Sequence, residues 1–180
     1  MKSMQYRTVP KNGDRLSTLG YGTMRLPTRV GRIDEERAIR QIRSAIDRGV
    51  NYIDTASPYH GGESERVVGK ALADGYREKV LLATKLSPWD VRTRGDMDRI
   101  LGEQLEKLRT SCIDYYLLHS LDAIQWKKLR DLGALEFLDS ACASGRIRNA
   151  GFSFHGDLGT LRQIIDAYPW IFCQIQYNFL

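Results

Sequence analysis

The sequence has few cysteines, and none is spaced for a metal site or a disulfide framework. Its three cysteines, Cys112, Cys142 and Cys173, lie about thirty residues apart and form no C-x-x-C pair. This usage is typical of a reducing compartment, so we expect a cytoplasmic protein. Runs of about 18 apolar residues without a charge are absent, as is the apolar stretch of a signal peptide, so we expect no membrane association.

Charge of one sign is not concentrated anywhere along the chain. The formal net charge is +5, but basic and acidic residues alternate, as in the segment 32–37. Scattered charge is typical of a solvated surface, so we expect no nucleic-acid partner. With 180 residues, 42% of them hydrophobic and 27% charged, the chain is long enough for one sizeable core. We therefore expect a single domain over residues 1–180.

Strand-like and helix-like runs alternate along the chain. It opens with a hairpin signal over about residues 5–18, where Asn12-Gly13 favours a tight turn. Apolar runs then predict six strands, at residues 17–23, 50–54, 80–85, 113–119, 147–153 and 171–177. Amphipathic segments between them predict five helices, from the N-cap Asp34 to Gly49 and at about residues 64–73, 96–109, 131–144 and 157–167. This alternation is typical of an α/β protein with a parallel sheet.

Polar side chains stand where successive apolar runs end. Asp54, Lys85, His119 and Ser153 each close such a run, about thirty to thirty-five residues apart. In a parallel sheet these positions share one edge, and in a barrel they meet at the C-terminal mouth, where such folds carry their chemistry. We expect Asp54 and Lys85, on adjacent strands, to form a pair, because an unpaired buried charge is costly. Tyr59 follows Asp54 by five residues.

These side chains suit the protonation of an oxyanion that forms from a carbonyl. A lysine cation beside a phenol favours the phenolate, and a buried carboxylate holds that lysine in place and charged. A histidine can donate a hydrogen bond to a carbonyl oxygen or relay a proton. Each residue alone also has an ordinary structural explanation: Asp54 as a loop cap, Lys85 as an exposed strand-end lysine, Tyr59 as a packed aromatic, His119 as a core histidine. The four together, at successive strand ends, favour the functional interpretation.

Longer motifs give the chain a family resemblance. They are LGYGTM (19–24), GVNYIDTA (49–56), Tyr59, ATK (83–85), IDYYLLH (113–119), GRIR (145–148), GFS (151–153) and QIQYN (174–178). In this order and spacing the chain resembles the aldo-keto reductases over essentially its whole length. The segments MRLP (24–27), PYHGG (58–62) and GFSFHG (151–156) are similar to the bacterial and archaeal branch of iron–sulfur-containing aldo-keto reductases.

The resemblance implies a (β/α)8 barrel of the TIM type, with the N-terminal hairpin plugging its bottom. It also implies hydride transfer between NADPH and a small aldehyde or ketone. Such barrels typically have about 250 residues and at least about 200. The resemblance therefore implies that the 180-residue chain is truncated after about six strands. The loop that grips the 2′-phosphate, and any iron–sulfur cluster of the branch, would lie beyond Leu180, so no metal is expected within this chain.

The resemblance also implies roles for individual residues. Tyr59 would be the general acid, Lys85 would tune it, Asp54 would pair with Lys85, and His119 would orient the carbonyl. On the cofactor side it implies a set made of Gly22, Thr23, Met24, Asp54, Ser153 and Gln174, of which the last two would hold the nicotinamide carboxamide. Gln174 has an alternative interpretation as a strand residue that faces the barrel interior. Phe154 departs from the family pattern, because many relatives carry an Asn there that adds a carboxamide contact.

Two other functions stay open at this point. The first is a non-catalytic subunit that binds or senses a nicotinamide cofactor, against which the intact set of polar residues argues. The second is a metal-dependent hydrolase that would use His60, Glu63, His119 and His155. Their spacing is not a known ligand motif, and Lys85 would repel a cation in the mouth. We further expect the isolated chain to be unstable or inactive, because an incomplete barrel leaves two open sheet edges.

Overall fold

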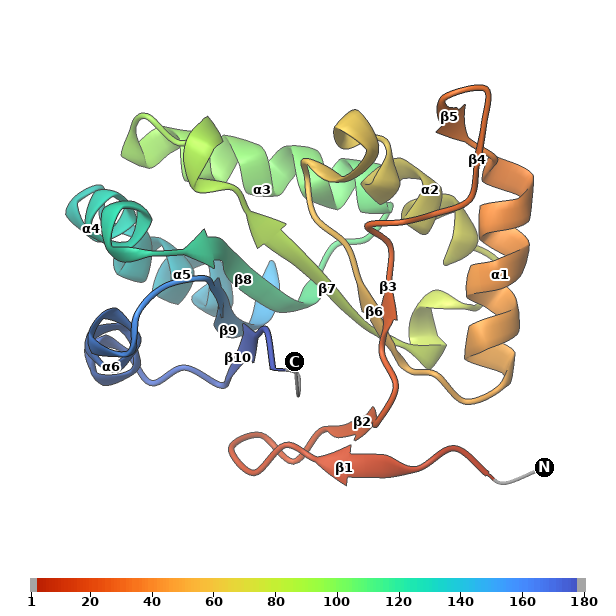
Figure 1. The fold of residues 1–180 in the computed structure, drawn as a ribbon, viewed down its shortest axis with the longest axis horizontal. Coiled ribbons are helices and arrows are strands. Elements are labelled where there is room, and N and C mark those ends of the chain that lie inside the picture. Colours follow the sequence, from red (N-terminus) through yellow and green to blue (C-terminus); the bar gives the residue numbers. More distant parts are fainter. Residues whose placement is uncertain (1–2, 178–180) are drawn as a thin grey trace.

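Six parallel strands form the main sheet of the computed structural model, which describes residues 3–177. Their order in space follows their order in the sequence (Figure 1). The strands are β3 (Tyr21–Gly22), β6 (Tyr52–Asp54), β7 (Leu81–Leu86), β8 (Ile113–Leu121), β9 (Ile147–Phe154) and β10 (Phe172–Ile175). The predicted α/β class and the six predicted strands are confirmed. Below, the C-terminal strand ends are called the mouth, and the N-terminal ends the bottom.

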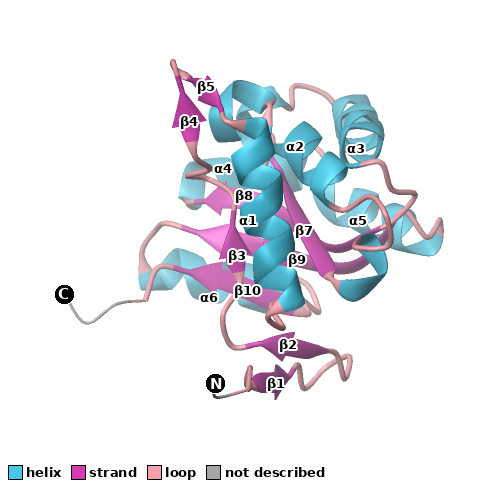
Figure 2. Ribbon diagram, turned by 90° about the vertical axis from the view of Figure 1, so that its right-hand side faces the viewer, coloured by secondary structure: helices cyan, strands magenta, loops and turns pink. Residues whose placement is uncertain are grey.

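Helices connect the strands and cover one face of the sheet (Figure 2). They are α1 (Glu35–Asp47), α2 (Ser64–Ala71), α3 (Arg94–Leu108), α4 (Ala123–Asp131), α5 (Ala134–Ala143) and α6 (Leu158–Ala167). Asp34 caps α1 as predicted, because its carboxylate accepts a hydrogen bond from the N–H of Arg37 at 3.1 Å. Short 3₁₀ turns precede or follow strands at η1 (Tyr59–Gly62), η2 (Arg77–Lys79) and η3 (Pro88–Asp90).

The two faces of each central strand pack into different clusters. On β8, Tyr116 and Leu118 belong to the large cluster between sheet and helices, whereas Tyr115 and Leu117 belong to a smaller cluster on the opposite face. This follows from the two-residue period of a strand. The period also places Lys85 on the same face of β7 as Ala83, a member of the smaller cluster. The lysine therefore points to the interior of the curved sheet.

One glycine permits close contact between two helices. A Cβ at Gly69 of α2 would lie 2.4 Å from the main-chain oxygen of Lys107 on α3. Any larger residue would push α2 away from α3, because backbone atoms cannot move aside as a flexible side chain can. This contact matters for the site, because α2 and α3 together cover β7.

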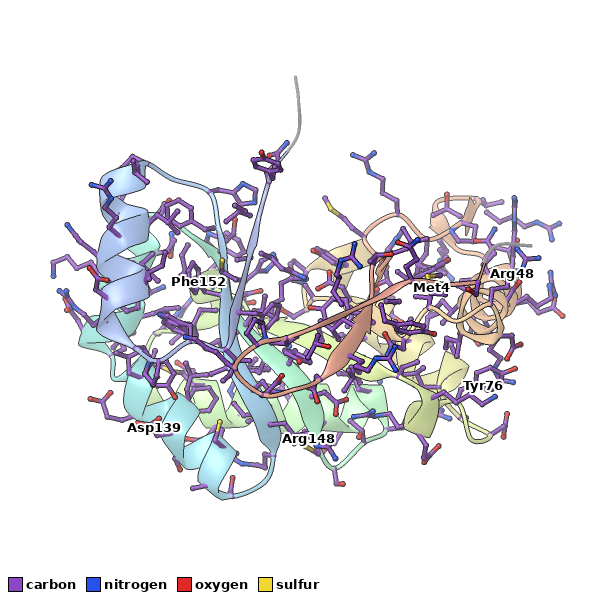
Figure 3. All side chains as sticks on the ribbon, turned by 90° about the horizontal axis from the view of Figure 1, so that it is seen from below. Met4, Arg48, Tyr76, Asp139, Arg148 and Phe152 are labelled. Carbon is purple, nitrogen blue, oxygen red and sulfur yellow. The ribbon has the colours of Figure 1, made fainter. Side chains whose placement is uncertain are left out.

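The N-terminal hairpin is present, but its turn is wider than the sequence predicts. Strands β1 (Tyr6–Thr8) and β2 (Arg15–Ser17) are antiparallel, and the connection between them spans residues 9–14. Gly13 has a positive φ of 80°, whereas Asn12 does not join it. The Asn12 amide instead donates to Tyr115 Oη and to Asn149 Oδ1, each at 3.0 Å. The hairpin thus crosses the bottom of the sheet, as the view from below shows (Figure 3).

Two other regions differ from the expectation. The helix predicted at about 131–144 is confirmed as α5, whereas the helix before it, α4, was not predicted. Gly133 separates them with a left-handed φ of 78°, which a continuing helix cannot contain. A small antiparallel hairpin, β4 (Thr28–Arg29) and β5 (Arg32–Ile33), was not predicted, because its strands are short and polar. Within residues 3–177, no helix is long and apolar enough to cross a membrane.

Candidate active site

The mouth brings the predicted strand-end residues together. Asp54 is the last residue of β6, Lys85 is the penultimate residue of β7, and Ser153 is the penultimate residue of β9. The expectation that His119 closes its strand is wrong, because β8 continues to Leu121. The register between β8 and β9 shifts in this stretch, which lets the longer β8 stay paired with β9.

Lys85 is the centre of the site. Its ammonium donates to Asp54 Oδ2 at 2.7 Å, to the main-chain oxygen of Thr55 at 2.8 Å and to Tyr59 Oη at 3.2 Å. An ammonium has three N–H donors, so these acceptors use all of them. Lys85 is only 2% exposed, and the adjacent carboxylate offsets the cost of burying its charge. The expectation that Asp54 and Lys85 form a pair is confirmed.

Tyr59 reaches Lys85 from the turn that follows β6. Its N–H donates to the main-chain oxygen of Ala56 at 3.2 Å, which begins the turn. The next residue, His60, has a left-handed φ of 53°. Its Nε2 accepts a hydrogen bond from the N–H of Leu26 at 2.9 Å, so the side chain ties the turn to the loop after β3. These contacts direct the tyrosine ring toward the mouth.

His119 lies beside Tyr59, with the two ring centroids 6.0 Å apart in an edge-to-face arrangement. Within residues 3–177 its Nδ1 is buried without a hydrogen-bond partner. Burial lowers the pKa of this imidazole to about 4, and the charges of Lys85 and His155 act in the same direction. At neutral pH His119 is therefore uncharged.

The residues predicted for the cofactor side divide into exposed and internal groups. Met24 is 61% exposed, and the Cβ direction of Gly22 opens into free space. Thr23 is fully buried, and both its N–H and its hydroxyl donate to the main-chain oxygen of Asp54. In this structure Thr23 therefore supports Asp54 and does not face the mouth. Ser153 Oγ accepts from the N–H of Ser120 at 2.6 Å.

Gln174 crosses the interior from β10 to the opposite side of the sheet. Its amide nitrogen lies 3.1 Å from both Tyr52 Oη and Asp54 Oδ1 and donates to them. This arrangement agrees with the interior-facing interpretation, while its predicted carboxamide contact stays a prediction. Together, Gln174 and Lys85 occupy both oxygens of the Asp54 carboxylate. Asn178, the last residue of the same motif, lies outside the described residues.

Two neighbours of the site were missed by the sequence reasoning. The ring of Trp89 lies 5.6 Å from that of His119, and the tryptophan is 54% exposed at the mouth. It follows β7 within η3, where Pro88 marks a loop and an exposed aromatic is a usable signal. Gln104 of α3 donates to the main-chain oxygen of Lys85 at 3.0 Å. In the sequence, Gln104 could have been found as a polar residue on the otherwise apolar face of a predicted helix.

The residues considered for a metal-dependent hydrolase do not gather into one cluster. Within residues 3–177, no group of three or more metal-ligating side chains is close enough to hold an ion. His60 Nε2 is engaged by a main-chain N–H, and Glu63 pairs with Arg66 at 3.8 Å. His155 is exposed. Lys85 places a buried cation at the mouth, where it would repel a metal ion.

Comparisons with known proteins show the family to which the chain belongs. The sequence model described as "Aldo/keto reductase family" matches residues 18–180. The chain is 37% identical over 130 residues to aldo-keto reductase YhdN of Bacillus subtilis, a match that covers 67% of this chain and 39% of that protein. It is 33% identical over 151 residues to methylglyoxal reductase YeaE of Escherichia coli, covering 83% and 50%. The chain thus spans about half the length, or less, of these curated relatives.

Solved structures share the fold. Aldo-keto reductase AKR11C1 of Bacillus halodurans, in its holo form, matches with a TM-score of 0.82 and 28% identity, over 97% of this chain and 58% of that one. An aldo-keto reductase of Klebsiella pneumoniae in complex with NADPH matches with a TM-score of 0.73 and 28% identity, over 93% and 55%. From the family match and the shared sheet topology, we conclude that the chain belongs to the aldo/keto reductase family.

Proposed function

We propose that this chain forms part of an NADPH-dependent carbonyl reductase, in which Tyr59 donates the proton to an aldehyde or ketone oxygen. The observation that supports it is the direction of one hydrogen bond. The Lys85 ammonium can only donate, so Tyr59 Oη accepts in their 3.2 Å contact. The phenolic hydrogen is therefore left to point elsewhere, and the open side is the mouth. A substrate oxygen placed there would receive a hydrogen bond that becomes a proton transfer.

Lys85 and Asp54 would support Tyr59 as the acid by holding a positive charge beside its hydroxyl group. A buried cation next to the phenol stabilises the negative charge that remains after the proton has left. The Asp54 carboxylate holds the cation, and Gln174 holds the carboxylate from the other side. The three groups are fixed before substrate arrives, which is the condition under which electrostatic stabilisation is most effective.

His119 would orient the carbonyl. Because its pKa is lowered to about 4, the ring is neutral at pH 7 and can offer one N–H donor without adding a second cation beside Lys85. Its ring stands edge-on to Tyr59, so the two side chains would approach the same oxygen from different sides. A neutral donor polarises the carbonyl without competing with Tyr59 as the source of the proton.

The residues around the mouth fit a nicotinamide dinucleotide. Gly22 presents open space, Met24 is exposed, and Ser153 still has its hydroxyl hydrogen free to donate, because its oxygen accepts from Ser120. Gln174 could turn its amide from Tyr52 toward a carboxamide. When bound, the reduced cofactor would supply the hydride. NADPH is the cofactor in the Klebsiella structure named above, and a small dicarbonyl is suggested as substrate by the name of the Escherichia coli relative.

The test is NADPH oxidation by the natural protein that carries this chain, measured with a panel of aldehydes and ketones. We expect turnover that depends on Tyr59, and cofactor binding that survives Tyr59→Phe. Turnover unaffected by Tyr59→Phe would contradict the proposed role of this residue. Cofactor binding with no turnover on any carbonyl would favour the alternative, a non-catalytic cofactor-binding subunit. The iron–sulfur-containing branch stays a prediction, which metal analysis of the same protein would test.

A further inference from the structure

A buried polar cluster lies behind β7, between the sheet and the helices. It consists of Glu65 of α2, Thr84 of β7, Gln104 of α3 and Tyr116 of β8, none of them more than 1% exposed. Polar groups buried in an apolar layer are costly unless they are hydrogen-bonded, and hydrogen bonds among them make the local structure rigid. Among the described residues, Glu65 Oε1 has such partners, whereas Oε2 has none and lies 3.7 Å from Lys107 Nζ. The cluster touches the strand that carries the central lysine of the site, which suggests a use for that rigidity.

The main-chain oxygen of Lys85 accepts a hydrogen bond from the cluster and not from β6, because β6 is short. Two residues earlier on the same edge of β7, the oxygen of Ala83 accepts from the N–H of Thr55 at 2.9 Å. β6 ends at Asp54, so the next oxygen on this edge, that of Lys85, lies past the strand pairing. Gln104 Nε2 donates to it at 3.0 Å. A side chain of α3 thus continues the ladder where β6 has stopped.

The cluster fixes which end of the Gln104 amide faces Lys85. Its Oε1 accepts from the hydroxyl of Tyr116 at 2.7 Å, and its Nε2 donates to Glu65 Oε1 at 2.8 Å. The hydroxyl of Thr84 donates to the same Glu65 oxygen at 2.7 Å. Because a carboxylate only accepts, Glu65 requires the NH₂ end of the amide, which is the end that also reaches Lys85.

We propose that Gln104, oriented by Glu65, is a positioning residue for Lys85. It holds the end of β7 so that the ammonium stays within reach of Asp54 and Tyr59 at the same time. The kinetic consequence rests on the function proposed above. A displacement of about 1 Å in the support of a reacting group can cost up to about 100-fold in rate. Gln104 touches neither substrate nor cofactor, so its effect passes through Lys85.

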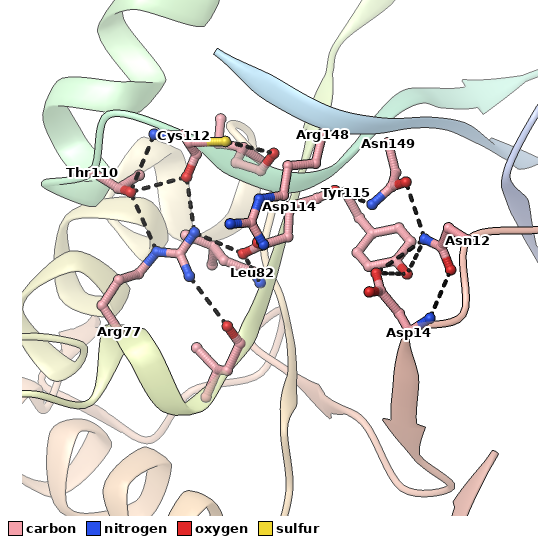
Figure 4. Close-up of polar contacts among 12 residues, drawn as sticks. Asn12, Asp14, Arg77, Leu82, Thr110, Cys112, Asp114, Tyr115, Arg148 and Asn149 are labelled. Carbon is pink, nitrogen blue, oxygen red and sulfur yellow. Dashed lines mark hydrogen bonds and ion pairs between the residues drawn. The ribbon is translucent and has the colours of Figure 1, made fainter. Parts of the chain in front are cut away.

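The kinetic experiment compares Gln104→Met with Asn149→Leu in the natural protein. Both substitutions replace a buried amide with an apolar group of similar size. Asn149 is a matched control because its amide also donates to a strand oxygen, that of Asp114 at 2.9 Å, but at the bottom (Figure 4). We expect Gln104→Met to lower kcat about tenfold, within the limit of about 100-fold for a displaced reacting group, and to change KM by less than about twofold.

The control separates positioning from stability. Asn149→Leu should lower the Tm to a similar extent while leaving kcat within about twofold of wild type. Glu65→Gln, which keeps size but offers the amide a second possible orientation, should lie between wild type and Gln104→Met in kcat. Equal losses of kcat in Gln104→Met and Asn149→Leu, or an unchanged kcat in Gln104→Met, would overturn the proposal.

A second readout does not need turnover. The ¹⁵N–¹H signal of a lysine ammonium is visible only when hydrogen bonds slow its exchange with water, and Lys85→Met assigns the signal of Lys85. We expect that signal to broaden or vanish in Gln104→Met and to persist in Asn149→Leu. If no carbonyl is reduced but this contrast is seen, the proposed function fails and the positioning role stands. If carbonyls are reduced but the Lys85 signal is unchanged in Gln104→Met, the positioning role fails and the proposed function stands.

Discussion

The mouth and the bottom of the sheet each contain a tyrosine in a hydrogen-bond network with a carboxylate, but the two networks connect these groups differently. At the mouth, Tyr59 Oη accepts from Lys85. At the bottom, the hydroxyl of Tyr115 donates to Asp14 Oδ2 at 2.6 Å and accepts from Asn12 at 3.0 Å (Figure 4). The hydroxyl of Tyr115 therefore donates its hydrogen bond within the protein, whereas the hydroxyl hydrogen of Tyr59 is available to a ligand.

The charged groups that contact the two phenol oxygens differ in sign. Burial raises the pKa of Tyr115, and the adjacent Asp14 carboxylate raises it further. Such a phenol stays protonated and holds the hairpin to the sheet. At the mouth the group that touches the phenol oxygen is the Lys85 ammonium, which donates to it. The lesson is that the sign of the nearest charge, and the direction of one hydrogen bond, separate a structural tyrosine from a proposed acid.

The two buried carboxylates differ in the same way. Asp114 Oδ2 accepts from Arg77 at 2.6 Å and from the N–H of Leu82 at 2.9 Å, and Arg148 lies 3.2 Å from Oδ1. Arg77 also donates to main-chain oxygens of two segments, so the group fastens η2 to the starts of β7 and β8. Asp54 instead holds a single lysine that is shared with Tyr59. The bottom pair joins strands, and the mouth pair contacts the proposed proton donor, Tyr59.

The largest expected effect comes from removing each phenol in turn. Tyr59→Phe should lower kcat by about 10² to 10⁴, the range for loss of a general acid, with little change in Tm. Tyr115→Phe should leave kcat near wild type and cost about 1 kcal/mol of stability, because Asp14 loses its donor. Steady-state kinetics and thermal unfolding measure both. Equal effects on kcat would remove the distinction between the two ends.

Replacing the two cations should give the next largest effects. Lys85→Met should lower kcat about 100-fold, because it removes a fixed charge beside the developing one. Arg77→Met should leave kcat nearly unchanged but reduce the free energy of unfolding by about 3 kcal/mol, since Asp114, 2% exposed, loses its main partner. Urea unfolding and kinetics together check this pair. A greater loss of stability in Lys85→Met than in Arg77→Met would reverse the comparison.

His119 should make the stability of the protein sensitive to acid. Its pKa is about 4 in the folded protein and about 6.5 when exposed. The unfolded chain therefore binds a proton at pH values where the folded one does not, and stability is lost as the pH falls from about 6.5 to about 4. After discounting for its partial exposure, this loss is on the order of 2 kcal/mol.

Urea unfolding at several pH values tests this prediction. His119→Gln should flatten the dependence of the unfolding free energy on pH in this window. The exposed His155 is the matched control, and His155→Gln should leave most of the slope in place. A slope that is the same in wild type and His119→Gln would show that other groups cause the acid sensitivity.

The smallest expected effect is at the hairpin. Asn12→Ala removes donors to Tyr115 and Asn149, and Asn12 is itself exposed. We expect a loss of about 1 kcal/mol in stability and no change in kcat or KM. Hydrogen exchange of the β1–β2 amides should increase while that of β7 stays constant. Faster exchange in β7 would mean that the bottom and the mouth are coupled.

Much of the architecture was predictable because it follows from local patterns. The apolar runs gave the strands their approximate bounds, and the thirty-residue spacing of Asp54 and Lys85 placed both at one edge. The errors arose where the local pattern was ambiguous. The helix α4 before Gly133 was not predicted, and the side chain of Asn12 binds across the bottom, so the Asn-Gly pair does not form a tight turn.

The sequence by itself determined that Asp54 and Lys85 lie at the same edge of the sheet, because strand period and short crossovers leave parallel strands little choice of edge. Only the tertiary structure decided what those residues do to one another. Lys85 contacts a tyrosine 26 residues away, and Gln174 contacts Asp54 across 120 residues. Such contacts depend on the direction of side chains brought together by packing, which no local period encodes. The same holds for Gln104. Its amide donates to the main-chain oxygen of Lys85, which lies past the end of β6.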